Sequence, residues 1–289
     1  MKIKSNDFLV SNGKKLNLDK WPTRIKPYYR SAAHFDELFG ESTHKLSSLQ
    51  RLLFASGGHS LLVIFQAMDA AGKDSAIRHI FTGIDPHGCL VHSFKLPSAQ
   101  ELKHDFLWRT TCLLPERGMI GVFNRSYYEE VLVVRVHPEY LKNQGIPPDL
   151  YDVRTIWKER FESIVNSEKH LRRNGTRILK FYLHLSKEEQ RKRLLARLDV
   201  PDKNWKFNFG DIEERKLWKD YMRAYEEAIG ATSKSDAPWH IIPADDKKNA
   251  RLIISEIIVE TMQELKMSYP ILGQERQKEL EEIRNLLAK

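Results

Sequence analysis

The sequence predicts an α/β protein in which a five-stranded parallel sheet lies between two layers of helices. Two observations carry this prediction. Five short apolar runs recur along the chain, and each is too short to form a core helix. Amphipathic segments with helix-capping signals separate these runs. Buried strands that alternate with helices are typical of a doubly wound sheet, whose right-handed crossovers place helices on both faces.

The apolar and amphipathic segments can be placed along the chain. We expect strands at 61–65, 89–94, 119–123, 178–185 and 239–243. We expect helices at 31–55, from 73 to about 81, at 98–114, 150–173, from 186 to about 197, from 211 to about 228, and at 250–265 and 275–289. Capping boxes, in which Ser is followed three residues later by Glu, begin the helices at Ser98 and Ser186, and Asp211 is expected to cap a third.

The composition bounds the class of protein. The chain has 289 residues, 41% of them hydrophobic, but no apolar run approaches the roughly 18 residues that cross a membrane. The first ten residues lack the apolar core of a signal peptide. We therefore expect a cytoplasmic protein with no membrane partner.

The charge favours polyanionic partners. Lys and Arg total 47 against 39 acidic residues, which gives a net charge of +8. Such an excess suits nucleic acid, nucleotides or a phosphate polymer, and does not choose among them. No Arg-rich tail, RNA-binding aromatic motif or zinc-finger spacing is present, so we do not expect a nucleic-acid partner.

The stretch LLVIFQAMDAAGKDS, residues 61–75, predicts a phosphate-binding loop. A buried strand is followed by a turn of small residues that ends in Gly-Lys, and then by a helix. In this layout backbone N–H groups, a helix N-terminus and a lysine all point at phosphate oxygens. The residues expected to contact phosphate are Ala70, Ala71, Gly72, Lys73 and Ser75.

This loop departs from the usual G-x-x-x-x-G-K-[ST] pattern. Ala67 replaces the first Gly, Asp74 stands where the magnesium-binding Ser or Thr belongs, and Asp69 lies inside the loop. A carboxylate beside phosphate is repulsive unless a metal lies between them, so we expect Asp69 to hold Mg²⁺. The alternative is a strand–turn–helix corner with a solvated lysine.

Two polar residues follow the third strand. Asn124 and Arg125 occupy the place where phosphate-loop enzymes keep a carboxylate linked to the metal. An amide can bind a magnesium-bound water, and Arg125 can clamp phosphate oxygens with two N–H groups. The alternative is that the pair caps a helix and meets a nearby acid.

A basic segment after the fourth strand predicts a lid. Its candidate cations are Arg193, Arg197, Lys203 and Lys206. Cations of this kind neutralise a moving phosphoryl group and exclude water when a lid closes. A solvated helix face is the alternative. Further anion contacts are expected from Lys95 and Arg109, which follow the second strand.

Several long motifs closely resemble the polyphosphate kinase 2 family. They are FQAMDAAGKDS, HDFLWR at 104–109, FNRSYYEEVLVVRVHP at 123–138, LHLSKEEQRKR at 183–193, KNWKFNFGDIEER at 203–215 and APWHIIPADDK at 237–247. The likeness covers roughly residues 30–266 in the right order. Asn124 is similar to the subgroup that acts on both nucleoside mono- and diphosphates (class III).

The resemblance implies a thymidylate-kinase-like, P-loop kinase fold and Mg²⁺-dependent phosphoryl transfer between inorganic polyphosphate and adenine or guanine nucleotides. It implies a reversible conversion of AMP to ADP and of ADP to ATP. The implied phosphate and magnesium site is Asp69, Lys73, Asp74, Asn124 and Arg125, with Asp69 and Asn124 at the metal. The implied nucleotide contacts are Asn124, Tyr127, Tyr128 and Glu129.

The residues also bear on mechanism and organisation. No Ser/His/Asp set occurs and no histidine spacing calls for a phosphohistidine, so direct in-line transfer is expected. An ATP-dependent nucleoside or metabolite kinase and a non-catalytic nucleic-acid-binding protein are the alternatives. We expect an N-terminal extension at 1–55, a phosphate-loop domain at 56–266 with a lid at about 191–211, a helical tail at 267–289, and assembly into a homo-dimer or homo-tetramer.

Overall fold

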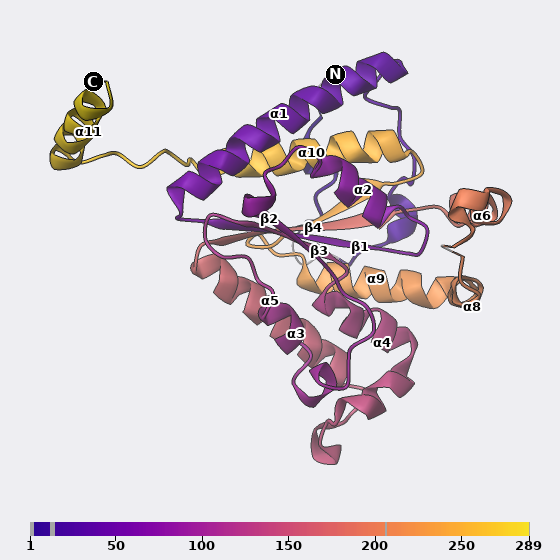
Figure 1. Cartoon of the computed structure of the whole chain (residues 1–289). Helices are drawn as coiled ribbons and strands as arrows, with labels where there is room; N and C mark the ends of the chain where they lie inside the picture. Colours follow the sequence, from indigo (N-terminus) through magenta and orange to yellow (C-terminus); the bar gives the residue numbers. More distant parts are fainter. Residues whose placement is uncertain (1–2, 12–14, 206, 289) are drawn as a thin grey trace.

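The computed structural model describes residues 3–11, 15–205 and 207–288 and contains the predicted parallel sheet (Figure 1). Its strands are β1 (Ser60–Ala67), β2 (Cys89–Ser93), β3 (Ile120–Asn124), β4 (Thr176–His184) and β5 (Trp239–Pro243). Their order is β2-β3-β1-β4-β5, and every pair is parallel. The five predicted strands are confirmed, with ends that shift by one or two residues.

Strand β1 lies at the centre of the sheet. Val63 pairs with Val122 of β3 on one side and with Leu179 of β4 on the other. All eight residues of β1 are buried, because helices cover both of its faces. Strands that are buried on both sides are apolar throughout rather than alternating, which is how β1 could be predicted.

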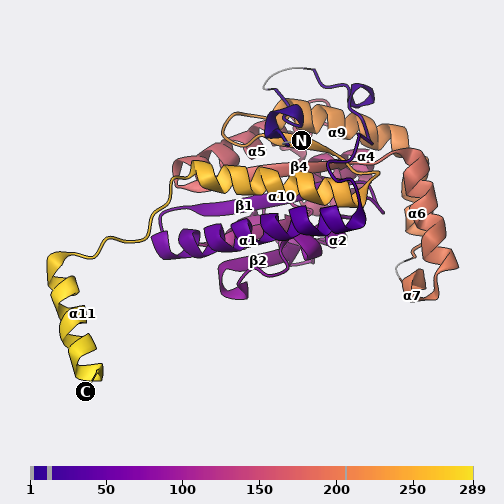
Figure 2. The ribbon, with the colours of Figure 1, turned by 90° about the horizontal axis from the view of Figure 1, so that it is seen from above.

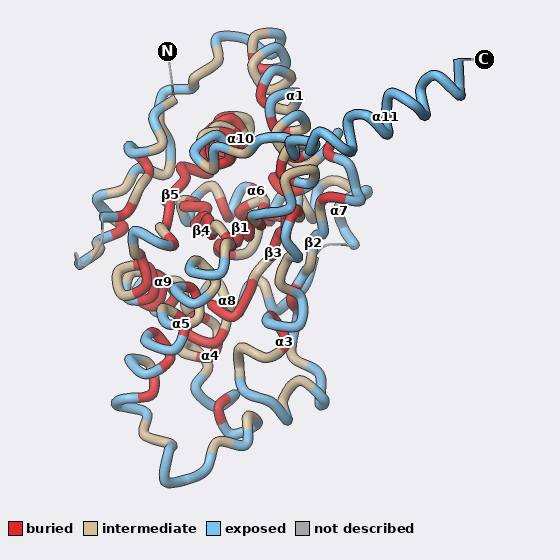
Figure 3. Tube along the Cα trace, turned by 90° about the vertical axis from the view of Figure 1, so that its left-hand side faces the viewer, coloured by how far each residue is buried: buried red, intermediate tan, exposed pale blue. Residues whose placement is uncertain are grey.

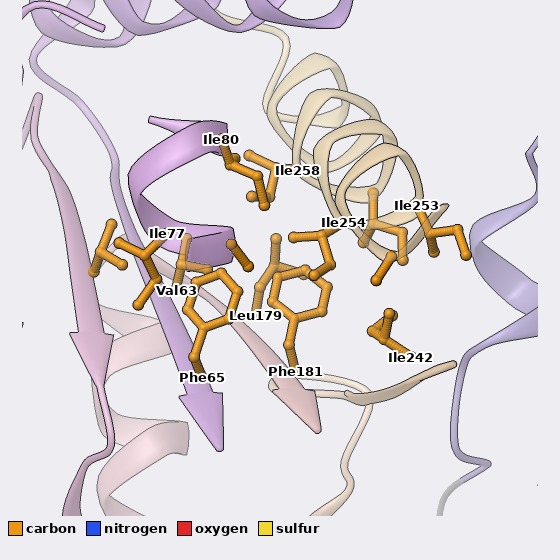
Figure 4. Close-up of a cluster of buried hydrophobic side chains, with 14 of the residues drawn as sticks. Val63, Phe65, Ile77, Ile80, Leu179, Phe181, Ile242, Ile253, Ile254 and Ile258 are labelled. Atoms are coloured by element: carbon orange, nitrogen blue, oxygen red, sulfur yellow. The ribbon is translucent and has the colours of Figure 1, made fainter. Parts of the chain in front are cut away.

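Three helices cover one face of the sheet. They are α1 (Ala32–Ser56), α2 (Lys73–Ile80) and α10 (Lys247–Glu264), seen above the strands in Figure 1 and side by side in Figure 2. Isoleucines from α2 and α10 meet aromatic and aliphatic side chains of β1 and β4, as Figure 4 shows for Ile77, Ile254 and Phe181. This packing fixes the start of α2, where the predicted phosphate-binding loop ends.

A second set of helices covers the other face. It comprises α3 (Trp108–Thr111), α4 (Val133–Val136), α5 (Ile156–Arg173) and α9 (Trp218–Thr232). Ile164 of α5 and Ile229 of α9 are fully buried in this second cluster, together with Tyr182 of β4. In Figure 3 the buried residues concentrate in the strands and on the helix sides that face them. The three-layer prediction is confirmed.

The N-terminal segment protects the edge of the sheet at β5. Val10 N–H donates to the carbonyl of Trp239 at 2.9 Å, and Ile241 N–H donates to the carbonyl of Phe8 at 2.8 Å. This short antiparallel contact pairs backbone groups that an edge strand would otherwise expose. Helix α1 then begins at its N-cap Ser31 and ends at Gly57, whose φ of 59° suits glycine.

The helix predicted at 98–114 is wrong. The capping box does form, since Ser98 N–H donates to Glu101 Oε2 at 2.6 Å. The segment is divided into the 3₁₀ turn η4 (Glu101–Lys103) and the short helix α3, because His104 is extended and Asp105 starts a new turn by accepting from Leu107 N–H at 2.9 Å. An aspartate that bonds to backbone two residues on competes with helix continuation.

The helix predicted from Asp211 is divided in two. Helix α8 (Gly210–Lys216) and helix α9 meet at Leu217, and Asp211 lies inside α8 rather than at its N-cap. Its carboxylate instead accepts from Arg197. Helices α6 (Lys187–Asp199) and α7 (Pro201–Asn204) precede α8.

The remaining elements are short, apart from one terminal helix. The other 3₁₀ turns are η1 (Ser5–Asp7), η2 (Leu18–Lys20), η3 (Pro86–Gly88), η5 (Tyr127–Val131), η6 (Pro138–Gln144) and η7 (Pro148–Leu150). Helix α11 (Gln274–Leu287) stands away from the sheet and its helices (Figures 1 and 2). Among the described residues, none of the helices combines the length and the apolar character needed to span a membrane.

Candidate active site

The loop between β1 and α2 has the backbone of an anion-binding turn. Ala70 and Gly72 have φ values of 62° and 100°, and Gly72 is the N-cap of α2. A φ of 100° would strain any residue with a Cβ atom, which accounts for glycine at this position. The first N–H groups of α2 are therefore available to an anion at the carboxyl end of β1, while the N–H of Ala71 in the turn donates to the carbonyl of Met68 at 3.3 Å.

Lys73 is buried beneath this turn. Its side chain is only 8% exposed, and its ammonium donates to the carbonyl of Ala67 at 2.8 Å. An ammonium has three N–H donors, and this is its one hydrogen bond within the described part of the chain. Burial lowers the pKa of Lys73, and the positive charge of Arg125 lowers it further, while Asp69 acts in the opposite direction.

Arg125 connects the end of β3 to the loop. Its guanidinium lies 3.3 Å from Asp69 Oδ1 and 3.2 Å from Glu129 Oε2. The Glu129 carboxylate raises the pKa of Arg125, and Gln66 holds that carboxylate from β1 at 3.0 Å. Arg125 also has a φ of 64°, which turns its side chain out of the strand direction. Glu129 is the nearby acid that the helix-capping alternative for Asn124 and Arg125 required. Arg125 nevertheless also contacts Asp69 in the loop.

Asn124 contacts the first turn of α2. Its Nδ2 donates to Asp74 Oδ1 at 2.7 Å, so the amide at the end of β3 is joined to the carboxylate that follows Lys73. Because the residue at the end of β3 is an amide and not a carboxylate, it is neutral and can donate the hydrogen bond that orients Asp74. The two aspartates of the site, Asp69 and Asp74, flank Lys73 in the sequence and line the same cavity.

That cavity has a volume of about 970 Å³ and opens at the carboxyl ends of β1, β2 and β3. It brings together most of the residues predicted from the sequence. These are Asp69, Ala70, Ala71, Gly72, Lys73, Asp74, Ser75, Lys95, Asn124, Arg125, Arg193 and Arg197. Strand ends meet at this edge because the sheet is parallel, which is where open α/β sheets bind ligands.

Arg193 holds the loop and is not a mobile lid cation. It is 9% exposed, and its guanidinium donates to the carbonyls of Ala71 at 2.8 Å and Ala244 at 2.7 Å. Its Nε donates to Glu189 at 2.9 Å, so each nitrogen of the guanidinium is engaged. The first half of α6 is thereby fixed to the body of the protein. Arg193 still lines the large cavity from this position, so its predicted contact with phosphate stays a prediction.

Arg109 is also placed differently from the prediction. It is 7% exposed, donates to the carbonyl of Lys95 at 2.8 Å and lies 5.5 Å from the ring of Phe94. It lines a second cavity of about 260 Å³ rather than the large one. This smaller cavity is also lined by Phe106, Glu130, Gln144 and Arg160, among others.

Tyr127 and Tyr128 are core residues, which corrects the prediction that they line a nucleotide pocket. They are 3% and 0% exposed, and both hydroxyls donate to Glu168 Oε1, at 2.9 and 2.8 Å. The ammonium of Lys180 completes the network with Glu168 Oε2 at 2.6 Å. Glu129, another predicted nucleotide contact, binds Arg125 and Gln66 and is not among the residues that line the large cavity.

Some site residues lie outside the prediction or outside the described residues. Lys206 and the side chain of Lys203 belong to the latter group. Arg78 and Lys247 line the large cavity, and Arg251 donates to Ser75 Oγ at 2.8 Å, although none of the three is among the predicted site residues. Lys247 follows the carboxyl end of β5, so the strand-end rule that indicated Asn124 also points to it.

The site suits a magnesium ion that is shared with phosphates. The described residues contain no group of three or more His, Cys, Asp or Glu side chains that could enclose a metal. Mg²⁺ is commonly bound through one or two carboxylates together with substrate phosphates and waters. Asp69 and Asp74, beside a phosphate-binding turn, supply such a set.

Comparison with known proteins places the chain. A model of the polyphosphate kinase 2 family matches residues 31–270. The chain belongs to this family. It is 58% identical over 289 residues to the ADP-polyphosphate phosphotransferase of Rhodopseudomonas palustris, covering 100% of both chains. It is 47% identical over 226 residues to the AMP/ADP-polyphosphate phosphotransferase of Meiothermus ruber, covering 78% of this chain and 80% of that one.

Solved structures agree with this membership. The crystal structure of polyphosphate kinase 2 from Arthrobacter aurescens superposes with a TM-score of 0.86 at 36% identity, over 96% of each chain. The family resemblance and the kinase-like fold predicted from the motifs are therefore confirmed. The roles of individual site residues remain predictions.

Proposed function

We propose that the protein transfers phosphoryl groups between inorganic polyphosphate and adenine nucleotides, converting ADP to ATP and AMP to ADP in reversible reactions. The observation that carries this proposal is Lys73, a buried ammonium at a large cavity that has, among the described residues, a partner for only one of its three N–H donors. The cavity is far larger than one phosphate, and cations from helices α2, α6 and α10 and from the segments after β2 and β3 line it, so it suits a chain of phosphates. The two relatives act on polyphosphate and on ADP or AMP/ADP.

The site residues supply positioning and charge compensation. Lys73 and the N–H groups at the start of α2 bind the transferred phosphoryl group, and Arg125 binds a phosphate beside it. Arg193 fixes the loop through its carbonyls. Phosphoryl transfer needs attacking and leaving oxygens in line and cations around the moving group, and no protein nucleophile is required.

Mg²⁺ is the metal that this acid pair would hold, through Asp69 and Asp74, and when bound it neutralises charge on the bridged phosphates. Asn124 orients Asp74 by its hydrogen bond. The protein must hold the two carboxylates near the phosphates without strong repulsion between them. Lys73, which lies between Asp69 and Asp74 in the sequence, offsets their negative charge.

The nucleoside end of the acceptor fits the smaller cavity. Lys95 lines the large cavity and Pro97 the small one, so the segment after β2 borders both. Phe106 and the buried Arg109 give the small cavity an aromatic wall and a cation, which suit the face and the acceptor atoms of a purine base. A volume of about 260 Å³ accommodates one base.

The direct test is to incubate the protein with Mg²⁺, ADP and long-chain polyphosphate in the absence of ATP. Appearance of ATP with loss of polyphosphate supports the proposal. A second reaction supplies ATP with adenosine or with AMP and no polyphosphate. Turnover in that reaction together with inert polyphosphate would establish the alternative, an ordinary ATP-dependent kinase.

Use of AMP is tested separately. With AMP and polyphosphate alone, ADP should appear before ATP, because the two transfers occur in sequence at one site. The expectation that AMP is a substrate rests on Asn124, whose neutral side chain removes a negative charge from the acceptor side of the site. AMP that stays unchanged while ADP is consumed in a parallel reaction would limit the enzyme to diphosphate acceptors.

The same proposal includes where and in what form the protein works. Its substrates are cytoplasmic metabolites, so we place it in the cytoplasm. We also propose that it assembles into a homo-dimer or homo-tetramer, for which its unpartnered terminal helix is the physical support.

A further inference from the structure

Asp245 joins three segments that are distant in the sequence. It is the second residue after β5, is half-buried, and is not among the residues that line the large cavity. Its Oδ1 accepts from the N–H of Ser186 at 2.8 Å, and its Oδ2 accepts from the hydroxyl of Thr23 at 2.9 Å. Its own N–H donates to the carbonyl of Thr23 at 3.0 Å. The turn after β5 is thereby tied both to the start of α6 and to the segment that precedes α1.

The bond from Ser186 to Asp245 replaces half of a capping box. Ser186 is the N-cap of α6, and its hydroxyl accepts from the N–H of Glu189 at 3.1 Å. In a complete box the glutamate would reach back to the N–H of the serine. Here Asp245 accepts from that N–H, and Glu189 instead accepts from Arg193 Nε at 2.9 Å. The Asp245 carboxylate therefore leaves Glu189 free to orient Arg193, and its charge at the N-terminus of α6 is favourable.

The first turns of α6 hold the predicted phosphate-binding loop through its carbonyls. Gln190 Nε2 donates to the carbonyl of Asp69 at 3.0 Å, and Arg193 donates to that of Ala71 at 2.8 Å. The same guanidinium donates at 2.7 Å to the carbonyl of Ala244, in the turn after β5. Both side chains are buried. The path of the loop thus depends on where α6 begins.

We propose that Asp245 is a positioning residue for phosphoryl transfer, which fixes the start of α6 so that Gln190 and Arg193 hold the loop in its binding geometry. Thr23 anchors the other carboxylate oxygen, so the segment before α1 supports the site as well as the sheet edge. This inference rests on the proposed function, because it takes the loop to bind phosphate. A displacement of about 1 Å caused by a distant mutation can lower a rate by about 10².

The variants separate the hydrogen bonds of Asp245 from its bulk and charge. Asp245→Ala removes the bonds to both Ser186 and Thr23. Asp245→Asn can keep them, because its amide oxygen accepts from the Ser186 N–H and its amide nitrogen can donate to the Thr23 hydroxyl. The matched control is Glu226→Ala. Glu226 also ties the N-terminal segment to the body, by accepting from the N–H of Leu18 at 2.7 Å, but it lies on α9 and does not line the large cavity.

The first measurement is the rate of ATP formation from ADP and polyphosphate, per folded molecule as judged by circular dichroism. Asp245→Ala should lower kcat at least about tenfold and change the KM for ADP less than about twofold, because the bonds that it loses hold the loop and not the acceptor. Asp245→Asn should recover most of the rate, and Glu226→Ala should match the wild type. A wild-type kcat in folded Asp245→Ala, or an equal loss in Glu226→Ala, would overturn the proposal.

The second measurement is amide hydrogen exchange of residues 66–75 without ligand, which does not depend on activity. Exchange should be faster in Asp245→Ala and unchanged in Asp245→Asn and Glu226→Ala, because only the first loosens the loop. Thr23→Val should show a smaller effect than Asp245→Ala and Thr23→Ser none, a comparison that remains if Asp245→Ala does not fold. Equal exchange in all variants would overturn the inference. A wild type that makes no ATP, with faster exchange in Asp245→Ala, would refute the proposed function and not the hold of Asp245 on the loop.

Discussion

Lys73, the first residue of α2, and Lys180, in strand β4, are both buried lysines, but their hydrogen bonds differ. Lys180 donates to Glu168 at 2.6 Å, to Tyr128 at 2.8 Å and to the carbonyl of Thr232 at 2.9 Å. Lys73 donates to one carbonyl and lines a cavity of about 970 Å³. Within the described residues, the ammonium of Lys180 has partners for all three of its N–H donors, and that of Lys73 has a partner for one.

The difference separates a structural charge from a functional one. Burial lowers the pKa of both lysines. A buried charge is stable only when it is paired and hydrogen-bonded, and Lys180 meets that condition with fixed groups of its own chain. Among the described residues, the ammonium of Lys73 has one hydrogen-bonded carbonyl and only nearby carboxylates such as Asp69 to offset its charge, so we expect an anion in the cavity to satisfy its remaining donors. The variants below test this contrast.

The largest expected effect is on stability, at Lys180. Lys180→Met leaves Glu168 buried without its cation and should lower the free energy of unfolding by about 3–5 kcal/mol. Urea unfolding measures it. Replacing both residues, as Lys180→Met with Glu168→Leu, should recover most of the loss. A single variant as stable as the wild type would mean that Lys180 is not the satisfied charge described.

Lys73 should show its effect in turnover. Lys73→Ala should reduce the rate of ATP formation from ADP and polyphosphate by about 10²–10³, since one preorganised charge contact is typically worth that much. Its far-ultraviolet circular dichroism should match that of the wild type. A folded variant with near-normal turnover would remove Lys73 from the reaction.

His240 extends the comparison to a buried base that lies away from the cavity. It is 4% exposed on β5 and its Nδ1 has no hydrogen-bond partner in the described residues, and burial lowers its pKa from 6.5 to about 4. As the pH falls below 6.5, His240 becomes protonated in the unfolded chain, whereas in the folded chain it stays neutral until about pH 4. The folded state should therefore lose up to about 3 kcal/mol between those pH values.

Urea unfolding of His240→Leu at pH 7.5 and pH 5 checks this expectation, with the exposed His44→Gln as the matched control. The loss of stability on acidification should be smaller in His240→Leu than in the wild type and unchanged in His44→Gln. An identical pH dependence in all three proteins would show that His240 is not buried as a neutral base.

The smallest expected effect concerns the metal. Asp69→Asn should raise the Mg²⁺ concentration needed for half-maximal activity at least about tenfold, because the charge of the ligands sets the affinity for such cations. Asn124→Ala should raise it less, since Asn124 acts through Asp74. Magnesium titrations that give the reverse order would transfer the metal contact from Asp69 to Asp74.

The sequence predicted the sheet and the main contacts of the cavity well, because both follow from local patterns. Apolar runs located every strand, and the small residues before Lys73 located the turn. The rule that strand ends meet at one edge brought in Asn124 and Arg125. These signals need no knowledge of which distant side chains meet.

The errors came from pairings across the fold. Tyr127 and Tyr128 follow the site residues in sequence, but their hydroxyls bind a glutamate from α5. Arg193 resembles a lid cation until carbonyls from two loops are found on its guanidinium. Such partners are tens of residues away or more, and no local periodicity encodes them.

Measuring how a ligand changes stability shows whether Lys73 is held ready to bind phosphate. The free energy of unfolding is measured for wild type and Lys73→Ala, with and without long-chain polyphosphate. Without ligand the variant should be at least as stable as the wild type, because it no longer buries a poorly satisfied charge. At about a hundred times the dissociation constant, polyphosphate should stabilise the wild type by about 2.7 kcal/mol and the variant by much less. A variant that is unstable without ligand, or that polyphosphate stabilises as strongly as the wild type, would contradict the account.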